Sequence, residues 1–253
     1  MRKMRVLCAI IKVTFWNYLG VFFMDYKLIQ GDCLEQLKKI KKGSVKMVFA
    51  DPPYFLSTEN GISCSGGKMV SVKKGEWDNS ISLKEKHKFN RKWIKACKRV
   101  LTEDGSIWIS GTFHNIYSIG MALEEEGFFI VNNITWQKLN PPPNLACKCF
   151  THSTETILWA VKDKKHYTFN YALMKEQNGG KQHKDVWAGP LTPPKEKAHG
   201  KHPTQKPKYI LTKIIEASTN PGDLVLDPFS GSGTTGVCAL ELGRKYIGIE
   251  QEK

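Results

Sequence analysis

An aspartate followed by two prolines and a tyrosine has the residue types best suited to chemistry in this chain. Asp51-Pro52-Pro53-Tyr54 follows an apolar run, residues 45–50, which the sequence predicts as a short buried strand. The prolines fix φ and remove two N–H donors, so the chain there is stiff and presents carbonyl oxygens. A carboxylate beside a carbonyl only accepts hydrogen bonds, which suits an amino group on an aromatic ring, and Tyr54 offers a face for that ring. A plain Asp-Pro turn at a strand end is the alternative.

A glycine-rich turn near the other end of the sequence predicts a ligand site. Gly231-Ser-Gly-Thr-Thr-Gly236 lies between an expected strand at 224–227 and an expected helix at 234–242. Glycines let the backbone approach a ligand closely, and a helix N-terminus offers unpaired N–H groups. Glu250, 19 residues after Gly231, is placed to hold a ribose diol. A dehydrogenase or a purely structural turn would show the same glycines.

The elements that must position these motifs alternate between strand and helix signals. This alternation is typical of an α/β fold whose sheet is mostly parallel, with helices on both faces. We expect seven strands and five helices. The strands are 26–30, 45–50, 106–110, 128–137, 156–161, 224–227 and 246–250, and the helices are 34–40, 89–101, 116–126, 208–217 and 234–242.

The formal net charge of the chain is +14. Two segments that show neither a helical nor a strand period, about 55–80 and 138–201, coincide with its basic stretches. We expect one catalytic domain over 24–253, with a loop-rich recognition region at 138–201 inserted and a mobile basic loop at 55–80. Such charge favours a nucleic acid as partner, although solvated lysine faces are the alternative. The lysines expected to contact phosphates are Lys68, Lys73, Lys74, Lys181, Lys184, Lys195 and Lys197.

The first 23 residues are mostly apolar after a basic start, but Lys12 and Asn17 interrupt the run and no small-residue cleavage site follows. We expect Met24 to be the true start and residues 1–23 to be an upstream extension without a catalytic role. The seven cysteines show neither a paired framework nor CxxC spacing. This favours a reducing cytoplasm and predicts no metal site.

The two motifs together resemble a known enzyme family. Asp-Pro-Pro-Tyr with Asp-Pro-Phe-x-Gly-x-Gly-Thr is similar to the motif pair of amino-group DNA methyltransferases that use S-adenosylmethionine. The tetrapeptide comes before the glycine turn, as in the circularly permuted β class of that family. The turn at Gly31-Asp32 and the segment 202–207, His-Pro-Thr-Gln-Lys-Pro, match further motifs, so the likeness spans residues 25–250. The resemblance implies a Rossmann-like class I methyltransferase fold and S-adenosylmethionine as the cofactor.

The resemblance also implies cofactor contacts, several of which have a plainer alternative. Asp32 would lie near the cofactor's adenine amino group, or cap the following helix, or both. Asp227 would face the methionine ammonium, or merely end its strand. Thr204 and Lys206 would hold the methionine carboxylate, with a surface lysine as the alternative for Lys206. The other implied contacts are Phe229, Gly231, Ser232, Gly233, Thr234 and Glu250.

The form of the tetrapeptide implies adenine N6 as the methylated atom, because related cytosine-N4 enzymes more often begin with Ser. Cytosine C5 is excluded, since no Pro-Cys dipeptide occurs. Asp51 and the Pro52 carbonyl would accept the N6 hydrogens of a flipped-out adenine stacked on Tyr54. Residues 55–78 are similar to the Dpn/MboI-type enzymes that modify GATC in restriction–modification systems.

The expected partners are single- or double-stranded DNA, a second copy of the chain and a cognate restriction endonuclease, in a prokaryotic cytoplasm and away from membranes. Three alternatives stay open. The chain would be a cytosine-N4 DNA methyltransferase, an RNA amino-methyltransferase, or a truncated non-catalytic DNA-binding homologue. The last arises because the sequence ends at Lys253, soon after Glu250, where family members usually continue.

Overall fold

The computed structural model describes residues 26–55, 62–63, 69–70, 80–144, 146–197 and 205–252. The predictions for residues 1–23, for Thr204 and for the lysines at 68, 73 and 74 lie outside the described residues. Within those described, no helix is both long and apolar enough to cross a membrane.

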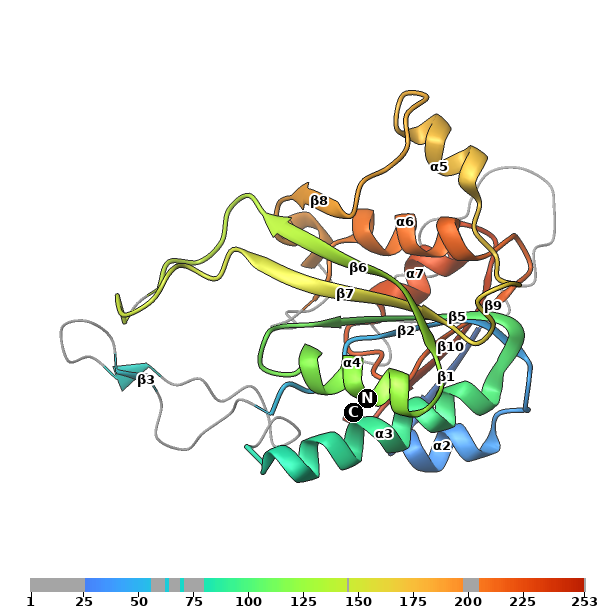
Figure 1. Cartoon of the computed structure of the whole chain (residues 1–253), viewed down its shortest axis with the longest axis horizontal. Coiled ribbons are helices and arrows are strands. Elements are labelled where there is room, and N and C mark those ends of the chain that lie inside the picture. The colour runs from blue at the N-terminus through green and yellow to red at the C-terminus, as the bar shows by residue number, and fades with distance from the viewer. Residues whose placement is uncertain are drawn as a thin grey trace.

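An eight-stranded sheet runs through the molecule in the order β1-β10-β9-β2-β5-β7-β6-β8 (Figure 1). Its strands are β1 Tyr26–Gln30, β2 Val45–Ala50, β5 Leu101–Gly111, β6 Phe129–Lys138, β7 Thr154–Val161, β8 Val186–Gly189, β9 Leu224–Asp227 and β10 Lys245–Glu250. A separate antiparallel pair joins β3 Ile62–Ser63 and β4 Met69–Val70.

Most neighbouring strands are parallel, as the sequence predicts. The five strands from β1 to β5 in sheet order pair in parallel, whereas β7 runs antiparallel to both β5 and β6. The prediction of seven strands is wrong, because β8 pairs in parallel with β6 at the sheet edge. Its four residues lie within the proline-rich region, where too short a run exists to show a period.

Helices cover both faces of the sheet. On one face lie α2 Cys33–Lys39, α3 Leu83–Val100 and α4 Ile116–Glu125; on the other lie α5 Tyr171–Gln177, α6 Lys208–Ser218 and α7 Thr234–Glu241 (Figure 1). A short 3₁₀ helix, η2, spans Pro194–Lys197. Each face has its own buried cluster, one around Trp93 and Ile94 of α3 and the other around Ile210 and Ile214 of α6.

Helix α3 shows how a local polar motif extends an apolar pattern. The apolar spacing predicts a start at residue 89, but the helix begins at Leu83. Ser82 accepts a hydrogen bond from the Glu85 backbone, and the Glu85 carboxylate accepts one from the Ser82 backbone, which forms a capping box. The cap satisfies the first N–H groups of a turn whose face is largely solvent-exposed.

The parallel order brings both sequence motifs to one edge of the sheet. The carboxyl ends of β1, β2, β9 and β10 point the same way, because these strands are parallel neighbours. In open α/β sheets this edge is where ligands bind. Asp51 follows β2 and the glycine turn follows β9, so the fold places the two motifs together.

Candidate active site

A cavity of about 480 Å³ lies at the carboxyl edge of the parallel strands. Its walls come from segments far apart in the sequence. They are residues 28–33, 51–55, 205–206, 227–232 and 248–252, together with Phe49, Phe89, Leu211, Thr234 and Thr235. The predicted target motif and the predicted cofactor turn therefore share one cavity.

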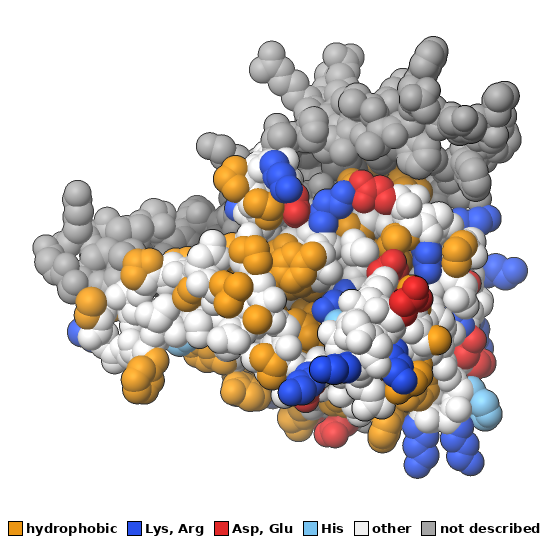
Figure 2. Space-filling model, turned by 90° about the horizontal axis from the view of Figure 1, so that it is seen from above, with side chains coloured by type: hydrophobic (Ala, Val, Ile, Leu, Met, Phe, Trp, Pro, Cys, Tyr) orange, Lys and Arg blue, Asp and Glu red, His pale blue; other side chains and the backbone are white. Residues whose placement is uncertain are grey.

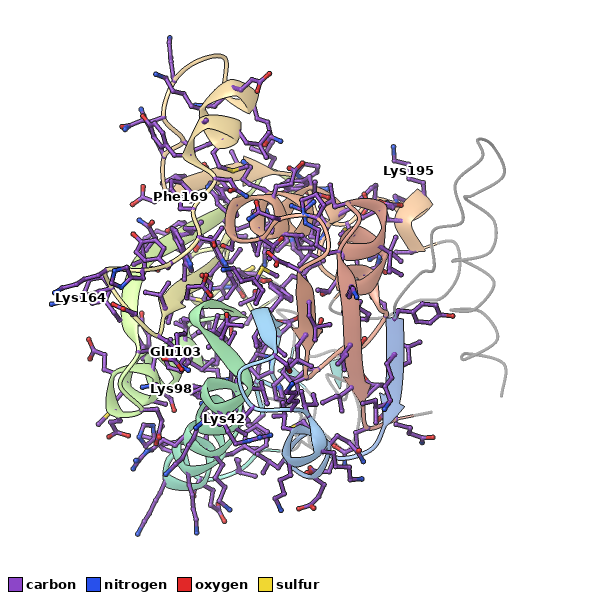
Figure 3. All side chains as sticks on the ribbon, turned by 90° about the vertical axis from the view of Figure 1, so that its right-hand side faces the viewer. Lys42, Lys98, Glu103, Lys164, Phe169 and Lys195 are labelled. Atoms are coloured by element: carbon purple, nitrogen blue, oxygen red, sulfur yellow. The ribbon has the colours of Figure 1, made fainter. Side chains whose placement is uncertain are left out.

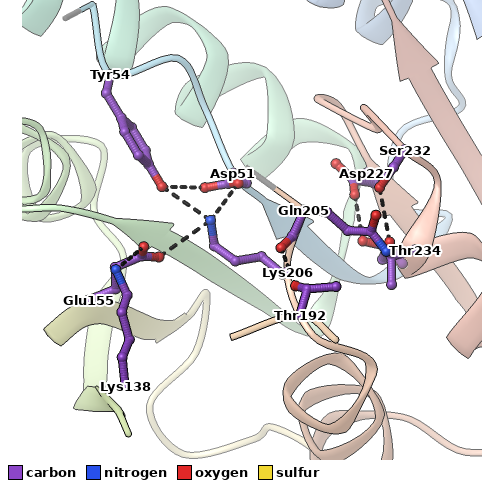
Figure 4. Close-up of polar contacts among 11 residues, drawn as sticks. Asp51, Tyr54, Lys138, Glu155, Thr192, Gln205, Lys206, Asp227, Ser232 and Thr234 are labelled. Atoms are coloured by element: carbon purple, nitrogen blue, oxygen red, sulfur yellow. Dashed lines mark hydrogen bonds and ion pairs between the residues drawn. The ribbon is translucent and has the colours of Figure 1, made fainter. Parts of the chain in front are cut away.

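The Asp51 carboxylate has a partner on each oxygen. The Tyr54 hydroxyl donates to Oδ1 at 2.7 Å, and the Lys206 ammonium donates to Oδ2 at 2.6 Å (Figure 4). Tyr54 is buried, and desolvation together with the charge of Asp51 raises the pKa of its hydroxyl well above the usual range. Tyr54 therefore stays a neutral donor, and its stacking on a base stays a prediction.

The proline turn is fixed from the α4 side. The Asn115 amide donates to the Pro53 carbonyl at 3.1 Å, and the Asn90 amide donates to Asn115 at 2.8 Å. Both asparagines are buried. The prolines stiffen the chain from within, and these two side chains hold it from outside. Asp51 is therefore presented in one orientation, as an acceptor that positions a substrate must be.

Lys206 lines the cavity, but its ammonium lies on the target side. It contacts Asp51, the Tyr54 hydroxyl at 3.2 Å and Glu155 Oε2 at 3.4 Å. Burial alone would lower the pKa of Lys206, but attraction by Asp51 and Glu155 outweighs burial and holds that pKa well above its usual range. The surface-lysine alternative is wrong, because Lys206 is buried. Its contact with the cofactor carboxylate stays a prediction.

The glycine turn is shaped by backbone geometry. Gly231 and Gly233 both have positive φ, 49° and 76°, which other residues rarely adopt. The Gly231 N–H donates to the Glu250 carboxylate at 2.6 Å, and the hydroxyls of Ser232 and Thr234 lie 3.0 Å apart. At the third glycine, Gly236, a Cβ would lie 2.5 Å from the Tyr246 ring, so only glycine lets α7 pack this close to β10.

Asp227 and Asp32 have structural partners in addition to their places in the cavity wall. Asp227 is buried and accepts from the Phe229 backbone at 3.0 Å and from the Thr235 hydroxyl at 2.6 Å. Burial, with smaller contributions from Asp51 and Glu250, raises the pKa of Asp227 to about 7. Asp32 accepts from the Glu35 backbone at 3.0 Å, so its predicted role as the cap of α2 is confirmed.

The lining residues fit S-adenosylmethionine. Five acidic residues of the described part of the chain line the cavity, Asp32, Asp51, Asp227, Glu250 and Glu252. A ligand with a sulfonium and an ammonium would relieve the unfavourable burial of Asp227 in particular. Phe229, which packs edge-on against Trp93 with centroids 5.3 Å apart, adds an apolar wall. The individual contacts between these residues and the cofactor stay predictions.

The described lysines of the predicted DNA surface lie away from the cavity wall. Lys181, Lys184 and Lys195 are exposed, and Lys197 is half-buried. Figure 3 shows Lys195 pointing outward from η2. On the face in Figure 2, the basic side chains of the described residues are interspersed with acidic ones and do not form one patch. These lysines are accessible to a polyanion, and their contact with DNA stays a prediction.

Two charged residues of this site are not predicted from the sequence. Glu155 in β7 and Lys138 at the end of β6 form an ion pair of 2.7 Å, and Glu155 reaches Lys206 from the side opposite Asp51 (Figure 4). Both side chains are only 12% exposed. The signal that the sequence offers is an acid directly before the mostly apolar run Thr156–Val161, a position where an acid usually needs a buried partner.

Comparison with known proteins gives one family. A family model described as DNA methylase, N6_N4_Mtase, matches residues 45–253. The Type II methyltransferase M2.DpnII of Streptococcus pneumoniae is 64% identical over 229 residues, which cover 89% of this chain and 85% of the relative. M2.MboI of Moraxella bovis is 50% identical over 230 residues, covering 90% and 84%.

Solved structures agree with this assignment. The crystal structure of an M1.HpyAVI–SAM complex is 30% identical, with a TM-score of 0.63 over 90% of this chain and 94% of that one. The cytosine-N4-specific PvuII DNA methyltransferase has a TM-score of 0.70 at 20% identity, over 90% and 82%, and so shares the fold. The prediction of a Rossmann-like methyltransferase fold is confirmed, while a circular permutation stays a prediction.

Proposed function

This chain belongs to the N6/N4 family of DNA methylases, and from that premise we propose that it methylates N6 of a flipped-out adenine, within the sequence GATC. As a family member it is a DNA methyltransferase, and S-adenosylmethionine is its cofactor. The observation that carries the proposal is the Asp51 carboxylate at the wall of the same cavity as the glycine turn.

The target side of the cavity is built to accept hydrogen bonds from an amino group. Asp51 and the Pro52 carbonyl accept hydrogen bonds from the two N6 hydrogens, which localises the nitrogen lone pair and makes it nucleophilic. One N6 proton departs after the methyl transfer. The Tyr54 hydroxyl, fixed on Asp51, holds the ring whose face the base stacks on. Stacking of this kind contributes about 1–3 kcal/mol, which offsets part of the cost of flipping the base.

The cofactor side holds a cationic ligand. When bound, S-adenosylmethionine supplies an electrophilic methyl group on a sulfonium. The carboxyl groups of Asp227 and Glu250 line the cavity, and a cationic ligand favours the ionised form of Asp227. The positive φ angles of Gly231 and Gly233 shape the turn around the ligand. The rate gain comes from alignment and electrostatics, because the protein only has to bring the nucleophilic amino nitrogen and the electrophilic methyl group together.

The sequence GATC is proposed from the similarity of residues 55–78 to the Dpn/MboI-type enzymes. The identity with two Type II methyltransferases, M2.DpnII and M2.MboI, supports the same choice. By the same reasoning we place the protein in a restriction–modification system, in the cytoplasm, with a cognate endonuclease in the cell and a second copy as its partner. Single- and double-stranded DNA are both candidate substrates.

The test is expression of the chain in a host that lacks DNA methylation, followed by sequencing that reads both the modified base and its context. We expect N6-methyladenine at GATC. N6-methyladenine in another context would overturn the site alone, whereas N4-methylcytosine would overturn the choice of base. DNA without modification, from cells that contain the folded protein, would favour the non-catalytic alternative.

A further inference from the structure

Four buried or half-buried charges form a row across the target side of the cavity. Lys138 contacts Glu155 Oε1 at 2.7 Å, Glu155 Oε2 lies 3.4 Å from the Lys206 ammonium, and Lys206 contacts Asp51 at 2.6 Å (Figure 4). Their signs alternate, and each side chain is no more than 15% exposed. In this row each charge lies beside a charge of opposite sign, which offsets part of the cost of burying it.

Glu155 comes from outside both sequence motifs. It is the second residue of β7, a strand that runs antiparallel to β5, and this direction brings its start to the edge where β2 ends. Burial would raise the pKa of Glu155, but Lys206 and Lys138 outweigh burial and hold that pKa below its usual range. Glu155 is therefore a buried carboxylate that stays negative.

In the present arrangement Lys206 weakens Asp51 as a hydrogen-bond acceptor for the target amino group. An ammonium on Asp51 Oδ2 neutralises the carboxylate that must accept hydrogens from the target amino group. The Tyr54 hydroxyl already occupies the other oxygen. Asp51 becomes a strong acceptor for the base when Lys206 moves its charge elsewhere, because acceptance by an unneutralised carboxylate gives the stronger, charge-assisted bond.

Glu155 offers the place for that charge. Its Oε2 atom is buried and receives no hydrogen bond from the described part of the chain, although it lies 3.4 Å from the ammonium. The same ammonium is closer to Asp51 by almost an ångström, at 2.6 Å. A small movement of one flexible side chain would exchange the two partners without exposing a charge.

We propose that Glu155 is a positioning residue for methyl transfer, which receives the Lys206 ammonium when the target amino group engages Asp51. This inference rests on the proposed function, because it requires an amino group at Asp51. In the free protein Lys206 holds Asp51 in place, and in the substrate complex Glu155 holds Lys206. The buried charge is balanced in both states.

The test is Glu155→Gln, which keeps the shape of the side chain and removes its charge. We expect the single-turnover rate constant, measured with saturating S-adenosylmethionine and DNA from a methylation-free host, to fall about 10- to 100-fold. The dissociation constant for S-adenosylmethionine should stay within about twofold, since the glycine turn is untouched. Glu126→Gln is the matched control, because Glu126 is 10% exposed, pairs with Arg91 and does not line the cavity.

A double-variant cycle separates positioning from simple charge balance. If Lys206 inhibits once Glu155 is neutral, Lys206→Met should cost less rate in the Glu155→Gln protein than in the wild type. Glu155→Asp keeps the negative charge but moves it away from Lys206, because the side chain is shorter. This variant should also lower the rate constant. It replaces Glu155→Gln as the test if that protein does not fold. A wild-type rate constant in either folded Glu155 variant would overturn the inference, as would strictly additive losses. Failure of the wild type to methylate DNA would instead overturn the proposed function.

Discussion

The two sides of the cavity are built in different ways. The cofactor side is built mostly from one stretch of the chain, residues 227–250, in which the backbone N–H of Gly231 donates to the Glu250 carboxylate. The target side is assembled from β2, β6, β7 and the segment before α6, and it is joined by side-chain charges. Local backbone geometry can be recognised in a sequence, whereas an ion-pair row across four segments becomes visible only in the fold.

The largest expected effect separates the two sides. Asp51→Ala should lower the rate of methyl transfer by at least about 10³-fold, because it removes the acceptor for the target amino group. Lys206 keeps Glu155 as a partner, so the fold should survive. Calorimetry with S-adenosylmethionine should give a dissociation constant close to that of the wild type. A rate near the wild-type value would show that the target side lies elsewhere.

The next effect concerns the cofactor side and follows from Asp227, whose pKa is raised to about 7. In the unfolded chain the pKa of this carboxyl is about 4, so between pH 4 and 7 the folded state binds more protons than the unfolded state. The free energy of unfolding should therefore fall as the pH rises from about 4 to 7. The loss should be on the order of 2–4 kcal/mol, and it should be absent from Asp227→Asn. Urea unfolding of the ligand-free protein at a series of pH values measures this. Equal slopes in both proteins would contradict the burial argument.

A smaller effect tests the packing of the glycine turn. Gly236→Ala places a Cβ against the Tyr246 ring, so it should lower the free energy of unfolding by about 1–3 kcal/mol and weaken S-adenosylmethionine binding. Gly120→Ala is the control, because its Cβ would meet only an ordinary contact at 3.7 Å, and the helix α4 gains from alanine. Thermal unfolding with and without cofactor compares the two. Equal stability of both variants would mean that α7 can shift.

The smallest effect lies outside both sides. Replacing Lys181 and Lys184 together by Ala should weaken DNA binding and reduce the slope of log affinity against log salt by about 1–2. Lys42→Ala is the control, because Lys42 is exposed just before β2, at the edge of the sheet opposite the cavity. Fluorescence titration of labelled DNA at several salt concentrations measures the slopes. Identical slopes in all three proteins would remove these lysines from the DNA surface.

Much of the fold follows from the sequence because its strands have clear limits. The bounds of β1, β2 and β9 agree with the predicted ranges. β2 and β9 are largely apolar runs followed by turn residues, which gives them clear limits. The apolar pattern does not predict the early start of α3, which depends on the cap at Ser82. It also does not predict α5 and β8, which lie in a region rich in proline. In such regions tertiary contacts, which no local pattern reports, decide the structure.

The site, like the fold, is predicted from the sequence only in part. Residue types and spacing identify Asp51, Tyr54 and the glycine turn; Asp51, Tyr54 and Gly231 line the cavity, whereas Gly233 and Gly236 shape the turn without lining it. Glu155 was missed, because a lone acid next to an apolar strand identifies no partner. For Lys206, the resemblance of segment 202–207 to a family motif places the residue near the cofactor, but only the fold shows that its ammonium lies on Asp51.

The central claim is that the cavity transfers a methyl group to an amino nitrogen of adenine. The most direct test incubates the protein with S-adenosylmethionine carrying a deuterated methyl group and with DNA from a methylation-free host, then analyses the nucleosides by mass spectrometry. The account predicts deuterated N6-methyladenine as the labelled product. Label in cytosine, or its absence from DNA while the cofactor is bound, would contradict it.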